Sequence, residues 1–307
     1  MSSDRRRSAA AVALPALFVL LWSTGFIAAK FGLPYAPPFK FLLLRFALVA
    51  LLMTIVALTT QATWPHAGRD AAHLTVAALL VHGGYLGGVF VAISEGVAAG
   101  TSAMLVGLQP IITVAVARAW LGEGVVARQW LGLVLGIVGV YFVVRHKIDF
   151  SGDLRGFLPI AVALCAISIG TLYQKRFCSH IDLRSAAVIQ FTACTIAYAP
   201  LAFFAGERPI QWTSDFLFAL GWSVLVLSVG AISLLNWLLR HGTAANIARL
   251  FFLVPAVTAA LAFAFFDERL DVAAMAGMVL IAVAVAIARA NPRGGAGPVV
   301  DHDQRSA

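Results

Sequence analysis

Charged residues are scarce in this 307-residue sequence: Asp, Glu, Lys and Arg make up only 12% of it. That is roughly half their share in a typical soluble domain. Apolar residues reach 61%, and the mean hydropathy is +0.91. A soluble fold would not have enough polar surface to cover so many apolar side chains. The composition therefore excludes a soluble enzyme, a secreted disulfide scaffold and a nucleic-acid binder, and it indicates a protein whose solvent is lipid.

Cysteine is nearly absent as well. Cys165, Cys178 and Cys194 are odd in number and lie in or beside apolar segments, so we interpret them as small hydrophobic residues and not as disulfide partners or metal ligands.

The sequence also lacks the constellations that catalysis inside a membrane requires. It has no His-Glu-x-x-His motif, no Gly-rich phosphate loop and no carboxylate near the middle of an apolar segment. We therefore expect no catalytic residue, metal or cofactor. A membrane-embedded enzyme or a non-transporting membrane scaffold remains the alternative to a transporter.

Apolar runs dominate what is present. A membrane span needs about 20 apolar residues, and ten segments meet that need. Arg5, Arg6 and Arg7 precede the first segment, but it continues to Leu33 without a clean cleavage region, so we expect an uncleaved first span. The predicted spans are 12–33, 38–60, 72–94, 99–121, 127–145, 156–176, 184–205, 215–239, 244–266 and 271–290.

Ten spans place both termini on the same side of the membrane. With the termini inside, thirteen basic residues fall on inner segments and five on outer segments, which favours cytoplasmic termini in the inner membrane. The 145–155 loop runs against this trend, because it places three basic residues outside.

An internal repeat organises these spans. When the chain is shifted by 145 residues, 15 of the 47 positions in 99–145 are identical to their counterparts in 244–290. Shared composition alone would give roughly one in eight. The unit holds five spans, so the second copy starts on the opposite side of the membrane. Such inverted repeats are typical of secondary transporters that work by alternating access.

The fold class predicted is thus an all-α polytopic membrane protein whose ten transmembrane helices form two inverted five-helix repeats. The predicted divisions are a cytoplasmic N-terminal segment 1–11, a first repeat 12–145, a connecting loop 146–155, a second repeat 156–290 and a disordered cytoplasmic tail 291–307.

Several short motifs resemble the EamA family of the drug/metabolite transporter superfamily, and the resemblance covers about 10–292. Its signals are Trp22-Ser23-Thr24-Gly25 leading to Lys30, then Pro37-Pro38, Leu44-Arg45-Phe46, Gln109-Pro110, Leu121-Gly122-Glu123, and Arg249 to Pro255 followed by Asp267-Glu268-Arg269. Phe266-Asp267 departs from the more usual Leu-Gly. The resemblance implies ten helices, cytoplasmic termini and a central cavity, with helices five and ten at the periphery. It also implies export of small metabolites, often amino acids.

Polar residues inside the spans form the short list for substrate binding. Arg45 lies about two turns into span two, where an unpaired charge costs ~2.5 kcal/mol or more. It either faces the cavity as an anion contact or snorkels to the interface. Lys30 and Arg249 are candidates for a gate or anion contact, with headgroup anchoring as the alternative.

His82 and Tyr85 lie one turn apart in span three. His82 either carries a coupled proton or is a neutral, hydrogen-bonded core residue. For the remaining candidates, cavity lining and plain helix packing both stay open. These are Gln109, Gln190, Asn236, and the aromatic residues Trp22 and Trp237.

Two features of shape complete the prediction. Pro110 and Pro255 occupy matching positions in the repeats and predict bent helices beside the cavity. Gly132, Gly136 and Gly139 give span five a small-residue face, which serves packing within the bundle or a homodimer contact; the sequence leaves both open. The expected partners are a small-molecule substrate and the lipid bilayer, with no nucleic acid.

Overall fold

The computed structural model describes residues 2–109, 112–113, 116, 127–144, 155–204, 208–231, 234, 238, 251, 253–268 and 272–289, and across these ranges it contains helices and no strand. Two of the elements, η1 and η2, are π-helices. In chain order the elements are α1 (Ser2–Gly32), α2 (Pro38–Thr59), α3 (Gly68–Ala78), η1 (Leu79–Gly84), α4 (Tyr85–Ser94), α5 (Ala99–Val106), α7 (Ala127–Val144), α8 (Phe157–Phe177), α9 (Leu183–Phe204), α10 (Ser214–Gly221), η2 (Trp222–Ala231), α13 (Leu253–Phe266) and α14 (Val272–Arg289).

Six helical stretches are long and apolar enough to cross a membrane, and they fall on predicted spans one, two, three, six, seven and eight. They are Ala13–Gly32, Pro38–Thr59, Gly68–Ser94, Phe157–Phe177, Leu183–Phe204 and Ser214–Ala231. Shorter apolar helices lie within predicted spans five, nine and ten. The chain is therefore an all-helical membrane protein. Its first helix is longer than expected, because α1 begins at Ser2 and not near residue 12.

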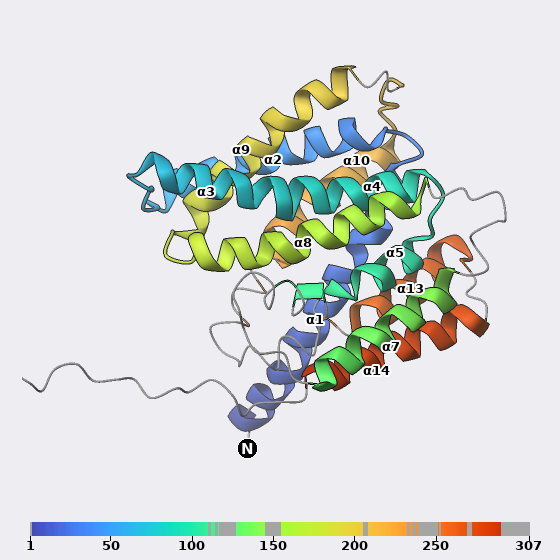
Figure 1. The fold of residues 1–307 in the computed structure, drawn as a ribbon. Coiled ribbons are helices and arrows are strands. Elements are labelled where there is room, and N and C mark those ends of the chain that lie inside the picture. The colour runs from blue at the N-terminus through green and yellow to red at the C-terminus, as the bar shows by residue number, and fades with distance from the viewer. Residues whose placement is uncertain are drawn as a thin grey trace, which may run out of the picture.

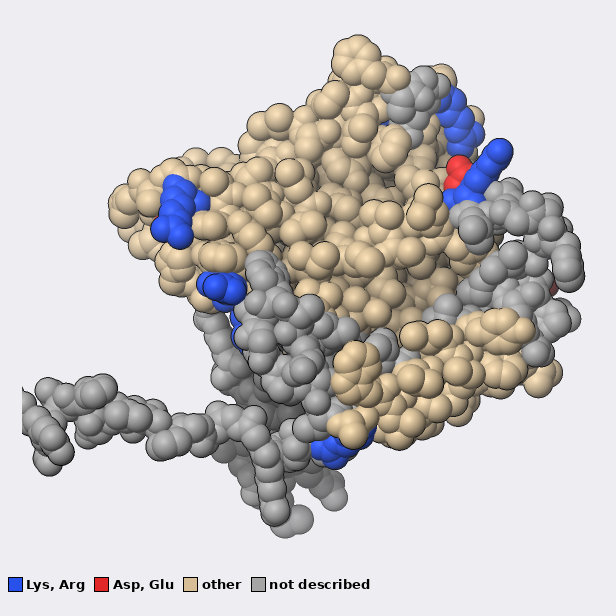
Figure 2. Space-filling view, viewed as in Figure 1, with Lys and Arg blue, Asp and Glu red and all other residues tan. Residues whose placement is uncertain are grey.

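The outer surface matches a lipid environment. Large apolar side chains are strongly exposed, among them Ile196, Phe203 and Phe204 of α9 and Leu58 of α2. Figure 2 shows Lys, Arg, Asp and Glu near the margins of the described surface, with a broad uncharged band between them. Apolar surface of this extent needs a lipid or protein partner, because water would penalise it.

Helices related by the 145-residue shift pack against each other. The shift carries α2 onto the range of α9 and α7 onto the range of α14, and both of these pairs are in contact. The rings of Phe46 and Phe191, which are themselves repeat counterparts, are 6.1 Å apart between α2 and α9. Figure 1 shows α7 and α14 side by side along one flank of the bundle.

A hydrogen bond recurs in both halves of the chain. The Ser23 hydroxyl of α1 donates to the Val254 carbonyl at 3.3 Å. The Ser168 hydroxyl of α8 donates to the Gln109 carbonyl at 3.5 Å. The 145-residue shift carries Ser23 onto Ser168 and Gln109 onto Val254, so each bond joins the first helix of one repeat to the other repeat.

A π-helix interrupts the third predicted span, which the sequence does not foretell. Two backbone carbonyls accept hydrogen bonds from α9, one in η1 and one at the end of α3: the Tyr198 hydroxyl donates to the Gly83 carbonyl at 2.8 Å, and the Cys194 thiol donates to the Ala78 carbonyl at 3.4 Å. Gly87 makes room for this contact, since a Cβ there would lie 2.1 Å from the Tyr198 hydroxyl oxygen. These contacts fix the turn that carries His82.

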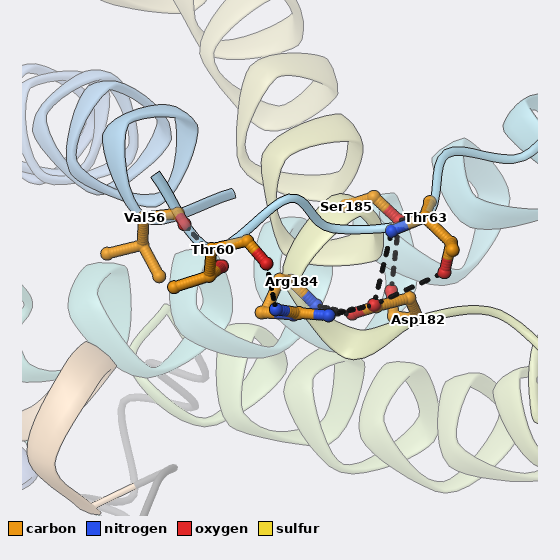
Figure 3. A network of polar contacts seen from close by, with 6 residues as sticks. All are labelled: Val56, Thr60, Thr63, Asp182, Arg184 and Ser185. Atoms are coloured by element: carbon orange, nitrogen blue, oxygen red, sulfur yellow. Dashed lines mark hydrogen bonds and ion pairs between the residues drawn. The ribbon is translucent and has the colours of Figure 1, made fainter. Parts of the chain in front are cut away.

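Polar contacts join two loops at the end of the bundle that we call the Asp182 end (Figure 3). The Asp182 carboxylate accepts hydrogen bonds from the backbone and guanidinium of Arg184, and from the Thr63 backbone amide and hydroxyl. Arg184 also donates to the Thr60 carbonyl at 2.9 Å, and Ser185 donates to the Thr63 carbonyl at 2.7 Å. The network ties the loop after α2 to the start of α9.

The α7–α14 contact depends on Gly139. A Cβ at this position would lie 2.7 Å from a side-chain carbon of Ile281 and 2.9 Å from the Gly277 carbonyl oxygen. Gly139→Ala should therefore destabilise the protein by about 1–3 kcal/mol, as overpacking does, and lower the unfolding temperature in detergent. Gly221→Ala is the matched control, because a Cβ there meets nothing within 4 Å. If Gly139→Ala unfolded at the same temperature as the unchanged protein, or at a higher one, this account of the packing would be contradicted.

The Asp182 network predicts a pH dependence. Hydrogen bonds from the Arg184 side chain hold the pKa of Asp182 well below its usual range. The stabilisation is thus complete above the unfolded-state pKa of about 3.9 and is lost as the pH falls below it. Asp182→Asn should lower the unfolding temperature by about 2–4 °C at pH 7.

The difference between Asp182→Asn and the unchanged protein should shrink as the pH is lowered from about 4 to 3. Glu95→Gln, an exposed change at the other end of the bundle, serves as the control and should show no such trend. A gap for Asp182→Asn that stays constant down to pH 3 would refute the role given to this carboxylate.

Candidate functional site

A cavity of about 350 Å³ lies within the bundle, a size within the range of small-molecule sites. Its walls come from α1, α2, η1, α4, α5, α8, η2 and α13, so both halves of the chain contribute. Six residues singled out from the sequence line it: Trp22, Arg45, His82, Tyr85, Gln109 and Pro255. Their placement makes this cavity the candidate substrate site.

Arg45 is the charged residue of the cavity wall and is only 7% exposed. One guanidinium nitrogen donates to the Ser228 hydroxyl at 3.3 Å, and Ser228 in turn donates to the Ser223 carbonyl at 3.1 Å. The Nε of Arg45 is buried and has no hydrogen-bond partner among the described residues. Arg45 is therefore held by η2 and does not snorkel to the surface, and it keeps an unused donor.

His82 faces the cavity from η1 and is held from behind by α9. Its ring stacks on Phe191 with 4.6 Å between centroids and an interplanar angle of 27°, and its side chain interacts with Gln190. Gln190 itself is buried but is not among the residues that line the cavity. In this structure Gln190 supports His82, and its predicted direct contact with substrate is untested.

The residues Arg45 and Gln190 are repeat counterparts, one on α2 and one on α9. Each interacts with the π-helix of the other repeat: Arg45 donates a hydrogen bond to Ser228 in η2, and Gln190 lies close enough to His82 in η1 to interact with it. The two halves therefore build the site in a similar way, and among the described lining residues the fixed positive charge comes from the first half.

An aromatic wall covers another side of the cavity. Trp22 of α1 and Phe251 lie edge to face, with ring centroids 5.3 Å apart, and both also contact Phe18. Phe26 and Phe90 add further apolar lining. Such a surface accepts an apolar group of a ligand without a polar cost.

An ion pair, which we call the Lys30–Glu268 lock, lies beyond the cavity at the opposite end from Asp182. The ammonium of Lys30 contacts the Glu268 carboxylate and sits 4.7 Å from the ring centroid of Phe266. The same carboxylate accepts from the backbone amides of Ala99 and Gly100 at 3.2 and 3.4 Å, so it also caps α5. Three helices, α1, α5 and α13, thus meet at one carboxylate.

The lock stands directly above residues of the cavity wall. Lys30 follows Phe26 by one helical turn on α1, and Ala103 follows Ala99 by one turn on α5; Phe26 and Ala103 both line the cavity. One turn is about 5.4 Å. The lock is therefore placed to hold the cavity closed on this side.

Some predicted residues lie outside the part of the chain that the structure describes. They are Pro110, Asn236, Trp237 and Arg249. Pro255 lies in the first turn of α13, where a proline loses no intrahelical hydrogen bond, and the bend predicted for it stays a prediction.

Other residues of the site escaped the sequence reasoning. Ser228 holds Arg45, yet serine is common in apolar helices, and the 3.6-residue pattern fails where η2 widens the helix. Thr171 lines the cavity but is equally common in apolar helices, while Gly25 and Phe251 line it and stood out in the sequence only as parts of family motifs. Within the described ranges, no group of three His, Cys, Asp or Glu residues could hold a metal ion.

Comparisons with known proteins agree on one family. The family model described as the EamA-like transporter family matches residues 9–145 and again 154–290. The transporter YvbV of Bacillus subtilis is 28% identical over 89% of this chain and 90% of its own length. A protein of Escherichia coli named a probable amino-acid metabolite efflux pump is 24% identical over 87% of this chain and 91% of its own length.

A solved crystal structure supports the fold alone. It superposes with a TM-score of 0.64 at 17% identity, covering 92% of this chain and 97% of that chain.

Proposed function

Because this chain belongs to the EamA-like transporter family, we propose that it is a secondary-active exporter of small metabolites, with amino acids or related compounds as its substrates. The observation that carries this proposal is the cavity of about 350 Å³ between the two halves of the chain, beneath the Lys30–Glu268 lock. The E. coli relative named as an amino-acid metabolite efflux pump supports the substrate class.

In this proposal ten spans form two inverted five-helix repeats in the inner membrane, with both termini in the cytoplasm. The six long apolar helices, the three shorter ones and the twofold family match support that arrangement. The Lys30 end then faces the outside, because α1 starts at the cytoplasmic N-terminus and ends at Lys30.

Alternating access follows from two similar packings of the repeats around one site. In the described state the Lys30–Glu268 lock closes the outer side of the cavity. Export would require this lock to open while contacts at the Asp182 end close, so that the solute leaves outward.

The direct test is flux through the purified full chain in proteoliposomes. Vesicles loaded with a panel of labelled amino acids, N-acetylated amino acids and 2-oxo acids should exchange at least one member faster than protein-free vesicles do. Arg45→Gln should reduce this flux, whereas Arg176→Gln, an exposed change on α8, should not. An absence of protein-dependent flux for every panel member would overturn the transporter proposal.

Opening of the lock can be measured by cysteine labelling. In a chain whose three cysteines are replaced, Val89→Cys places a thiol in the cavity wall. Glu268→Gln removes the partner of Lys30 and the charged cap of α5. A membrane-impermeant thiol reagent added outside intact cells should then label the introduced thiol faster. A loss of about 1.4 kcal/mol in the stability of the closed state corresponds to a labelling rate about tenfold higher.

Glu95→Gln lies at the same end of the bundle but outside the lock, and it should leave the labelling rate unchanged. Equal rates for Glu268→Gln and the unchanged lock would show that this ion pair does not close the cavity. Labelling that occurs only in inside-out vesicles would show that the Lys30 end faces the cytoplasm.

A further inference from the structure

The cavity holds a fixed cation, Arg45, and no described residue of the cavity wall carries an opposite charge. Arg45 is only 7% exposed, and its hydrogen bond goes to the neutral hydroxyl of Ser228. Its buried Nε has no partner among the described residues, and Arg45 itself lines the cavity. A buried charge without a counter-charge costs several kcal/mol. A ligand that brings a negative charge to Arg45 would therefore be stabilised in the cavity.

The sequence contains no carboxylate that could take this role from within a span. All fourteen acidic residues lie in the tails, between the apolar segments or in the first or last turns of helices. They are Asp4, Asp70, Glu95, Glu123, Asp149, Asp153, Asp182, Glu207, Asp215, Asp267, Glu268, Asp271, Asp301 and Asp303. Each described residue that lines the cavity is thus either cationic or neutral.

This charge pattern distinguishes two kinds of carboxylic acid. A carboxylate paired with Arg45 makes the site neutral, as bidentate arginine–carboxylate pairs do elsewhere. The ammonium of a free α-amino acid is separated from its carboxylate by one carbon, so it would be buried beside the same guanidinium. No acidic side chain is there to compensate it, and like charges in a low-dielectric site repel strongly.

The rest of the cavity favours an apolar group on the ligand. Trp22, Phe26, Phe90 and Phe251 give the wall a large aromatic surface. Tyr85 and Gln109 offer neutral polar contacts, which suit a carbonyl or an amide. A cationic side chain and an aromatic surface in the same cavity match an amphipathic monoanion.

We propose that this cavity binds monocarboxylate anions that carry an apolar side chain and no free ammonium group, such as N-acylated amino acids or 2-oxo acids, in preference to zwitterionic amino acids. The inference rests on the proposed transport function and narrows its substrate class. The carboxylate would contact Arg45, and the side chain would contact the aromatic wall.

Binding to the full chain in lipid nanodiscs tests the inference with ligands that share one side chain. The set is N-acetyl-leucine and 4-methyl-2-oxopentanoate as monoanions, leucine as the zwitterion, leucinamide as the cation and 4-methylpentanamide as the neutral compound. The two monoanions should bind about tenfold or more tightly than leucine, a difference of about 1.4 kcal/mol. The same series built on phenylalanine should show the same order.

Variants then locate the preference. Arg45→Gln should remove most of the preference for monoanions while leaving binding of the neutral amide within about twofold, and Arg45→Lys should retain part of it. Arg176→Gln should match the unchanged chain. Each variant is first compared by size-exclusion profile and unfolding temperature, so that loss of fold is recognised separately.

The outcomes separate this inference from the broader proposal. If leucine binds as tightly as N-acetyl-leucine, or if Arg45→Gln weakens all five ligands equally, the inference is wrong, while flux of leucine would still support a transporter. If none of these ligands binds, the inference is also wrong. Only the absence of flux for every solute in the proteoliposome panel would remove the transport function itself.

Discussion

The structure depends on one constraint, the cost of placing an uncompensated charge in an apolar medium. Among the described residues, carboxylates and most basic residues stand at helix ends, and Glu268 pairs there with Lys30 and with backbone amides at the start of α5. Arg45 is the exception. Its burial costs free energy, and its described hydrogen bond goes to a neutral serine hydroxyl. The exception therefore marks the candidate site.

The same medium explains how the two halves are joined. Within the lipid the hydrophobic effect does not drive helices together, because the acyl chains are as apolar as the helix surfaces. Helices therefore associate through close packing and hydrogen bonds. Gly139 lets α7 approach α14, and Ser23 and Ser168 form matching bonds between the halves. Large side chains serve mainly to fill the interior, as Phe46 and Phe191 do beside each other. Small and weakly polar residues thus determine which helices meet.

Much of this organisation could be predicted from the sequence, and the rest could not for definable reasons. Helix limits such as 38–60 and 184–205 follow from hydropathy and agree with α2 and α9 within a residue. Arg45, His82 and Trp22 could be named because polar and aromatic residues are conspicuous in apolar spans. The partnership of Glu268 with Lys30 joins residues 238 positions apart, and Ser228 acts through a π-helix, so neither has a local sequence signal. Which polar residues face the cavity was likewise beyond reach, as the position of Gln190 behind His82 shows.

The positions of the two π-helices indicate how the two repeats arose. A π-helix closes its hydrogen bonds over five residues where an α-helix closes them over four, so each contains a widened turn. Shifting Leu79–Gly84 by 145 residues gives a range that lies inside Trp222–Ala231. Two independent insertions at the same place are less economical than one. The widened turn then belonged to the ancestral five-helix unit, and duplication copied an existing irregularity that the two descendants have since equipped differently, one with His82 and the other with Ser228.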